Sequence, residues 1–167
     1  MRTIKTITVS IIMFFVYWLA QLVPKKKGLW IFGAWYGEKY GDNTKYLFEH
    51  INKNEPDIRP VWLTRNQFAF DLINTKGYEV YLTYSLKGFL LSMRAEKVFI
   101  TVGIKDVNRY AINRKDVIMM WHGNTPIKKI VFDDTITRHN QSFLEKMLFS
   151  FFPFLGTTRL NGFAISG

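Results

Sequence analysis

The stretch DVIMMWHGNTPIKK, residues 116–129, places an apolar run directly before a polar turn that contains glycine and proline. The run at 116–120 is typical of a buried strand. A buried parallel strand carries the loop after it to the ligand-binding edge of an α/β sheet. This loop contains one histidine, His122, and two adjacent lysines, Lys128 and Lys129. The stretch therefore predicts a central strand with a candidate site at its C-terminal end.

The side chains of this loop combine a base with positive charge. His122 can take or give a proton near neutral pH, and lysines bind phosphate as compact cations. Together with Gly123 and Thr125, these residues fit a site for a phosphorylated substrate. The residue types alone leave a second interpretation open, in which the strand ends in an ordinary polar turn.

The rest of the chain alternates between the periodicities of strands and helices. Short apolar runs predict strands at 29–32, 59–63, 79–82, 97–102 and 163–166. Between them lie helical patterns capped by Asp42 or Asn43, by Asn66 and by Ser85, and a fourth helical pattern at 141–152. Strands separated by helices predict an α/β fold with a largely parallel sheet and helices on both of its faces.

Composition limits the classes of protein and of site. A hydrophobic content of 48% excludes intrinsic disorder, and a net charge of +10 favours an anionic partner. The absence of cysteine excludes disulfides and cysteine-based metal or redox sites. The histidines, His50, His122 and His139, are too scattered to indicate a metal site. Nucleic acid is not expected as a partner, because most aromatic residues occupy core-facing positions.

The N-terminal segment carries a separate signal. Residues 6–24 lack charged side chains, whereas Arg2 and Lys5 precede them and lysines 25–27 follow. A membrane span needs about 20 apolar residues, so we expect 1–27 to form a membrane-anchoring helix that spans or lies in the interface. The basic flank predicts an anionic membrane surface as partner, with the rest of the protein on its cytoplasmic side. The alternative is a buried core helix.

A second candidate site is the loop GAWYGEKYGDN, residues 33–43, between the first strand and the first helix. Glycines let backbone amides approach a ligand, and a helix N-terminus favours anions. The glycine spacing matches neither the dinucleotide fingerprint nor the Walker A loop, which leaves an ordinary strand-to-helix turn as the alternative. The residues that we assign to substrate binding in the two loops are Gly37, Asp42, Asn43, Gly123, Thr125, Lys128 and Lys129.

Three ordered segments together resemble a known family. They are WIFGAWYG with DNTKYLF at 30–37 and 42–48, IRPVWLT at 58–64, and WHGNTPIKK at 121–129. The set resembles the CDP-glycerol glycerophosphotransferases, the teichoic-acid primases and polymerases of bacterial cell envelopes, over nearly all of residues 28–167. One departure is that Asn124 and Thr125 both precede Pro126, where the family motif has a single residue.

The resemblance implies a GT-B fold, in which residues 28–167 form the N-terminal, Rossmann-like, acceptor-side domain at the cytoplasmic face of the cell membrane. It also implies transfer of glycerol phosphate from CDP-glycerol to a lipid-linked acceptor, with release of CMP. His122 is then the base on the acceptor hydroxyl, and the CDP-activated polyol is a substrate, with no separate cofactor.

The same resemblance bears on how much of an enzyme this chain represents. The donor-binding domain of the family would lie C-terminal to residue 167, so we expect the chain to be a fragment that does not turn over alone. A last predicted strand at 163–166, directly before the end of the sequence, agrees with that expectation. The competing hypothesis is a non-catalytic, membrane-anchored, basic α/β binding module.

Overall fold

The computed structural model describes residues 2–121, 147, 151 and 162–163, and it alternates strands with helices. The strands are β1 (Leu29–Phe32), β2 (Arg59–Thr64), β3 (Val80–Leu82), β4 (Lys97–Ile100), β5 (Asp116–Met119) and β6 (Gly162–Phe163). The α-helices are α1 (Arg2–Ala20), α2 (Asp42–Asn54), α3 (Gln67–Thr75) and α4 (Leu86–Arg94). Two short 3-10 helices, η1 (Trp35–Gly37) and η2 (Ile104–Asp106), follow β1 and β4.

The six described strands form one sheet in the order β3-β2-β1-β4-β5-β6, and every neighbouring pair is parallel. This is the strand order of a doubly wound, Rossmann-like sheet. The predicted α/β class and parallel sheet are therefore confirmed. Of the strand predicted at 163–166, the described part is Phe163 in β6, and of the helix predicted at 141–152 only Met147 and Phe151 are described.

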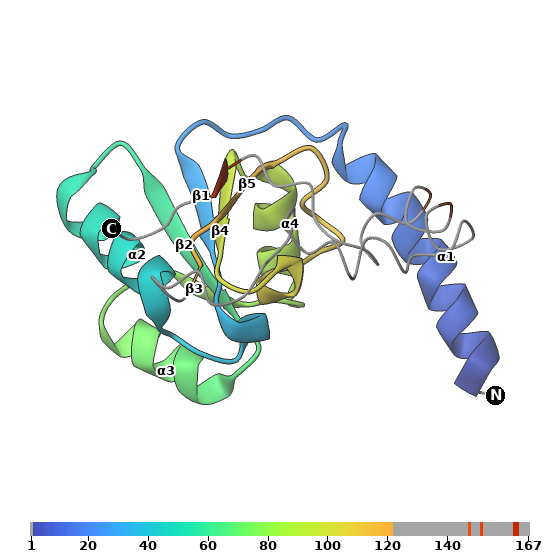
Figure 1. The fold of residues 1–167 in the computed structure, drawn as a ribbon, viewed down its shortest axis with the longest axis horizontal. Coiled ribbons are helices and arrows are strands. Elements are labelled where there is room, and N and C mark those ends of the chain that lie inside the picture. Colours follow the sequence, from blue (N-terminus) through green and yellow to red (C-terminus); the bar gives the residue numbers. More distant parts are fainter. Residues whose placement is uncertain (1, 122–146, 148–150, 152–161, 164–167) are drawn as a thin grey trace.

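Alternate residues of each strand point to opposite faces of the sheet, so the core has two halves. On one face, Phe32 and Trp62 pack with Phe48 of α2 and Ile73 of α3. The other half of the core contains Leu29, Ile31, Val61, Leu63, Val98 and Ile100, with Leu91 of α4 packed against them. Figure 1 shows α2 and α3 on one side of the sheet and α4 on the other, as the sequence predicts.

Two of the predicted helix caps are confirmed and one is wrong. Asn66 and Ser85 cap α3 and α4, because each side-chain oxygen accepts a hydrogen bond from the backbone N–H three residues on, at 3.3 and 3.1 Å. Helix α2 instead begins after Gly41, without a side-chain cap. The polar side chains of Asp42 and Asn43 contact other segments, and those contacts build the candidate site described below.

Helix α1 extends away from the sheet and joins it through its C-terminal end (Figure 1). Ala20 is fully buried, and the Asn113 side-chain amide donates to the Tyr17 carbonyl oxygen at 2.9 Å. Across the part of the chain that the structure describes, no helix combines the length and apolarity needed to cross a membrane.

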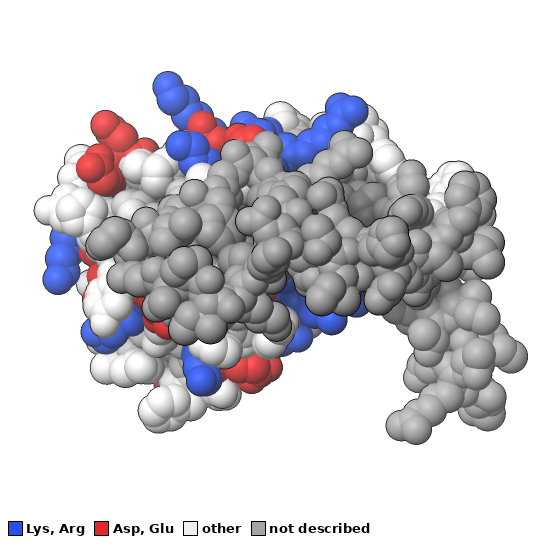
Figure 2. Space-filling view, viewed as in Figure 1, with Lys and Arg blue, Asp and Glu red and all other residues white. Residues whose placement is uncertain are grey.

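The connection between α1 and β1 carries the three consecutive lysines. Lys25 forms an ion pair with Asp116 at 3.1 Å, and the Lys26 N–H donates to the Arg94 carbonyl oxygen at 2.8 Å. Lys26 and Lys27 are exposed. In Figure 2, basic atoms lie along the upper edge, where this connection runs in Figure 1, with some acidic atoms among them.

Candidate functional site

The strand order places a topological switch point between β1 and β4. The chain leaves β1 toward β2 and β3 on one side, then returns to β4 on the other side. Loops that leave such a point in opposite directions separate at the carboxyl ends of the strands, which is where open α/β sheets bind ligands. The loops at this edge are residues 33–41 after β1, residues 101–115 after β4, and the segment that begins at Trp121 after β5.

The glycines after β1 allow protein segments to pack closely. A Cβ atom at Gly33 would lie 2.4 Å from the Asp106 carbonyl oxygen. Gly37 has φ +81°, is buried, and its carbonyl oxygen accepts hydrogen bonds from Arg65 N–H at 2.6 Å and the Thr64 hydroxyl at 2.8 Å. Close packing of the loops therefore accounts for glycine at both positions. The assignment of Gly37 to substrate stays a prediction.

The buried carboxylate of Asp106 joins the loop after β1 to the loop after β4. One oxygen accepts a hydrogen bond from the Tyr36 N–H at 2.7 Å. The other accepts from the backbone N–H groups of Thr101 and Val102, at 2.7 and 2.9 Å, and from the Thr101 hydroxyl at 3.1 Å. Backbone donors compensate for the burial of the charge. The Thr101 hydroxyl oxygen also accepts from the Trp35 N–H at 3.2 Å.

Uncommon backbone conformations gather at the same edge. Among the described residues other than glycine, positive φ angles occur at Trp35 (47°), Tyr36 (59°), Asp42 (60°), Arg114 (56°) and Trp121 (30°). All but Arg114 belong to the loop after β1 or its junction with α2, or to the end of β5. Such conformations persist where the surrounding contacts hold them, and they concentrate at functional sites.

The first turn of α2 connects the two loops that the sequence singles out. The Trp35 indole N–H donates to a carboxylate oxygen of Asp42. The side-chain amide nitrogen of Asn43 donates to the carbonyl oxygens of Met120 and Trp121, at 2.9 and 2.7 Å. Residues 33–43 and the beginning of the segment 121–129 therefore lie in contact.

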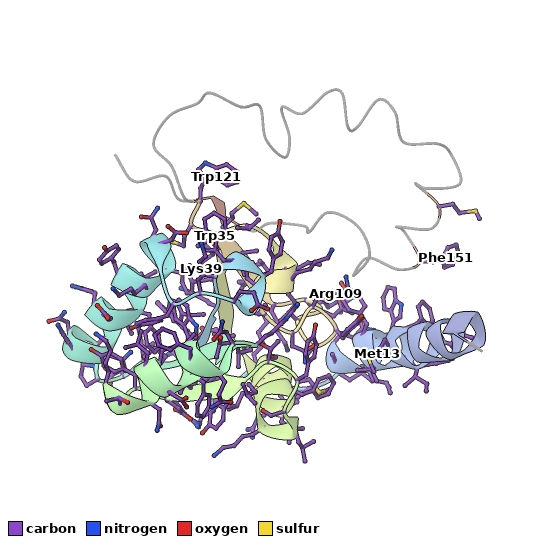
Figure 3. The ribbon with its side chains drawn as sticks, turned by 90° about the horizontal axis from the view of Figure 1, so that it is seen from below. Met13, Trp35, Lys39, Arg109, Trp121 and Phe151 are labelled. Carbon is purple, nitrogen blue, oxygen red and sulfur yellow. The ribbon has the colours of Figure 1, made fainter. Side chains whose placement is uncertain are left out.

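The predicted base lies just beyond this contact in the sequence. His122, Gly123, Thr125, Lys128 and Lys129 all fall outside the described residues, and their assignments stay predictions. Figure 3 shows the described end of that segment, with Trp121 beside the loop that carries Trp35 and Lys39.

Cationic side chains project from the loops that follow β1, β2 and β4. Lys39 Nζ lies 4.6 Å from the centroid of the Trp35 ring. The guanidinium of Arg65, directly after β2, stacks 5.1 Å from the centre of the Tyr84 ring and donates to the Lys105 carbonyl oxygen at 2.8 Å. Arg109 donates to the Tyr110 hydroxyl at 2.8 Å. Guanidinium and ammonium groups so placed are suited to phosphate oxygens.

The hydroxyl group of Tyr40, beside α2, has a raised pKa. Burial raises the pKa of the Tyr40 hydroxyl, and the hydrogen bond to the Glu49 carboxylate at 2.9 Å raises it further. Tyr40 therefore stays protonated and neutral near pH 7. Within the described ranges, no group of three or more His, Cys, Asp or Glu residues is placed to hold a metal ion.

Comparison with known proteins assigns the chain to a family. Residues 13–150 match the family model described as CDP-glycerol:poly(glycerophosphate) glycerophosphotransferase. The chain belongs to this family. The match includes both candidate loops, and it confirms the resemblance carried by the three sequence segments.

Two similar proteins show how much of a relative this chain covers. The chain is 25% identical over 117 residues to the teichoic acid poly(glycerol phosphate) polymerase of Staphylococcus epidermidis, which is 65% of this chain and 14% of that protein. It superposes on the structure of the wall teichoic acid polymerase TagF with a TM-score of 0.51 and 18% identity, covering 92% of this chain and 38% of that one. The second likeness supports the α/β fold, and the chain spans less than half the length of either relative.

Sequence patterns predicted the two candidate loops but not the contacts that hold them together. Local patterns do not reveal the roles of Asp106 and Arg65, because Asp106 accepts from Tyr36, 70 residues away, and Arg65 donates to Lys105, 40 residues away. Asp106 lies between Lys105 and Val107 in a largely polar stretch, so its neighbours in the sequence do not indicate that it is buried. Nothing in the sequence alone separates Arg65 from the other surface arginines.

Proposed function

We propose that the full-length protein transfers glycerol phosphate from CDP-glycerol to a lipid-linked acceptor and releases CMP, in the synthesis of teichoic acid or a related cell-envelope polymer. The observation that carries the proposal is the family match over residues 13–150. The contact of Asn43 with Trp121 adds support, since it gives the two candidate loops a common location at the ligand-binding edge of the sheet. We assign this chain to the acceptor side of a GT-B enzyme.

In the proposed reaction, an acceptor hydroxyl oxygen bonds to the β-phosphorus of CDP-glycerol. The bond from that phosphorus to the oxygen bridging to the α-phosphate breaks, and CMP leaves with this oxygen. His122 takes the hydroxyl proton as the oxygen attacks. A general base in this role contributes on the order of 10²–10⁴-fold to the rate.

Charge on the transferring phosphoryl group needs stabilisation during this step. Of the described residues, we assign this role to Lys39, Arg65 and Arg109, because their loops meet at the carboxyl edge of the sheet. We retain Gly123, Thr125, Lys128 and Lys129 as substrate-binding residues on the segment after Trp121. The proposal includes no metal and no cofactor, since the donor substrate itself carries the activated phosphoryl group.

The test is an assay of CMP release by the purified full-length protein, with CDP-glycerol and a lipid that ends in glycerol phosphate. We expect CMP release that requires both substrates. Replacement of the donor by CDP-ribitol determines which polyol phosphate the enzyme transfers. Binding to acceptor-containing vesicles without CMP release from either donor contradicts the proposal and favours the non-catalytic binding module.

We also propose that α1 attaches the protein to the cytoplasmic face of the cell membrane by lying in the anionic lipid interface. The support is a stripe of exposed apolar side chains at helical spacing along α1 and its immediate continuation: Ile11, Ile12, Phe15, Trp18, Leu19 and Leu22. Ala20 and the Tyr17 carbonyl face the domain instead. Lys26 and Lys27, exposed just beyond the helix, add electrostatic attraction to anionic lipid.

A further inference from the structure

The side chain of Asn43 makes two hydrogen bonds to the end of β5. Its amide nitrogen donates to two successive carbonyl oxygens, those of Met120 at 2.9 Å and Trp121 at 2.7 Å. An asparagine amide has two hydrogens to donate, and this geometry uses both. Residues 77 and 78 positions away in the sequence are thereby fixed to the first turn of α2.

The end of β5 is held from its other side as well. The Met120 N–H donates to the Ile100 carbonyl oxygen of β4 at 2.7 Å. Trp121 then adopts a φ of 30°, which is uncommon for a residue with a large side chain. A conformation of this kind persists only where surrounding contacts determine it, and the hydrogen bond from Asn43 to the Trp121 carbonyl is such a contact.

The position of Asn43 is itself fixed by the neighbouring loops. The preceding residue, Asp42, has φ 60° and accepts the indole N–H of Trp35. The Trp35 N–H in turn donates to the hydroxyl of Thr101, which also bonds to the buried carboxylate of Asp106. A continuous set of hydrogen bonds therefore runs from the loop after β4, through the loop after β1, to Asp42, the residue that precedes Asn43.

We infer that Asn43 is a positioning residue for the proposed base. The Trp121 carbonyl belongs to the peptide group that joins residue 121 to His122, and this group is planar. A hydrogen bond that fixes this carbonyl fixes the plane from which the backbone of His122 continues. The inference rests on the proposed role of His122, and it gives the amide nitrogen of Asn43 a structural role, because that nitrogen donates to two carbonyl oxygens within the protein. The assignment of Asn43 to substrate binding stays a prediction.

The sharpest variant is Asn43→Asp in the full-length protein. Aspartate keeps the shape of the side chain and is favourable in the first turn of a helix, but it replaces the donor with an acceptor that faces two carbonyl oxygens. The matched control is Asn52→Asp on the same helix, where the amide donates to the Phe48 carbonyl at 2.8 Å within α2 and the residue is exposed. Asn43→Ala is the second variant, since it removes the donor without adding charge.

We expect Asn43→Asp and Asn43→Ala to lower kcat for CMP release about 10–100-fold, because small misplacements of a reacting group have effects of this size. The KM for CDP-glycerol should change little, and Asn52→Asp should behave as the wild type. In a His122→Ala background, the Asn43 variants should cause no additional loss, since residues that act as one unit are not additive. An unchanged kcat, a loss confined to KM, or an equal loss in both backgrounds overturns the inference.

A readout independent of turnover separates this inference from the proposed function. In protein labelled on its histidine rings, the NMR titration of His122, assigned through His122→Ala, should change in Asn43→Ala, which adds no charge, and stay the same in Asn52→Ala. If wild-type protein releases no CMP, the proposed function is wrong, and an altered His122 titration still supports the positional coupling. An unaltered titration in folded Asn43→Asp and Asn43→Ala excludes the coupling even when the enzyme is active.

Discussion

Single polar side chains hold the C-terminal edge of the sheet together. Asp106 accepts backbone hydrogen bonds from two different loops, and Asn43 donates to two carbonyls of a third segment. Backbone groups in irregular segments need partners when they are removed from water. Each of these side chains supplies several partners at once, so the loops do not need regular secondary structure to keep a defined arrangement.

The ion pair between Arg59 and Glu79 permits a prediction about pH. The guanidinium donates to both carboxylate oxygens, at 2.8 and 2.5 Å. The hydrogen bond from Arg59 lowers the pKa of Glu79, although partial burial opposes the shift. A lowered pKa means that the stabilisation is present above the unfolded-state value of about 4.5 and is lost as the pH falls through the lower folded-state value.

We therefore expect Glu79→Gln to lower the free energy of unfolding near pH 7 by on the order of 1 kcal/mol, the upper range for partly exposed pairs. Urea titrations of wild type and variant at several pH values measure the difference. It should shrink as the pH falls below 4.5, where the wild-type carboxylate becomes protonated. Glu55→Gln, at an exposed position, serves as the control. A deficit that stays constant down to acidic pH is incompatible with this ion-pair account.

At the level of elements, local patterns predicted the strands and two of the helix caps. The apolar runs at β1, β2, β4 and β5 reflect burial on both faces of a parallel sheet, which is a strong and local signal. Asn66 and Ser85 cap α3 and α4 because an N-cap needs only a backbone N–H three residues away.

Other features depend on contacts that the local sequence does not reveal. Asparagine commonly caps helices, yet the side-chain amide of Asn43 donates to the carbonyl oxygen of Met120, just after β5 and far away in the sequence. In α4 the residues fully buried against the domain are Gly88 and Ser92, whereas Leu86 and Leu90 are exposed. A Cβ at position 88 would lie 2.4 Å from the Leu82 carbonyl oxygen, so the helix approaches β3 too closely for a larger residue. Hydrophobic spacing therefore identifies α4 but not its buried face.

Helix α1 is the element whose role is easiest to test by itself. Replacement of Phe15 and Leu19 by serine removes two exposed apolar side chains from the middle of the stripe. If α1 lies in the lipid interface, the double variant should bind anionic phosphatidylglycerol vesicles at least tenfold more weakly, because burial of such side chains contributes roughly 1.5–3 kcal/mol each. Co-sedimentation with the vesicles measures the change.

The control for this experiment is Phe68→Ser on α3, which removes an even more exposed aromatic side chain away from the stripe. Replacement of Lys26 and Lys27 by glutamine should weaken binding and reduce its dependence on salt, because screening acts on the electrostatic part alone. Vesicle binding that is unaffected by the Phe15 and Leu19 replacements contradicts attachment through this face of α1.

At the scale of the whole molecule, the strand order explains why residues far apart in the sequence can form one site. The loops after β1, β4 and β5 leave adjacent parallel strands at the same edge, and Asp106 and Asn43 link them. Of the sequence segments that indicated the family, residues 33–37, the start of 42–48 and Trp121 lie at this edge. The central proposal is that His122, the residue after Trp121, acts as the base for glycerophosphate transfer.

The most direct measurement is kcat for CMP release by the full-length protein carrying His122→Ala, compared with His50→Ala. His50 lies exposed on α2, near the distant end of that helix, and bonds only locally with Asn54 among the contacts described. The account predicts a loss on the order of 10²–10⁴-fold for His122→Ala and a wild-type rate for His50→Ala. A wild-type rate for folded His122→Ala would contradict it.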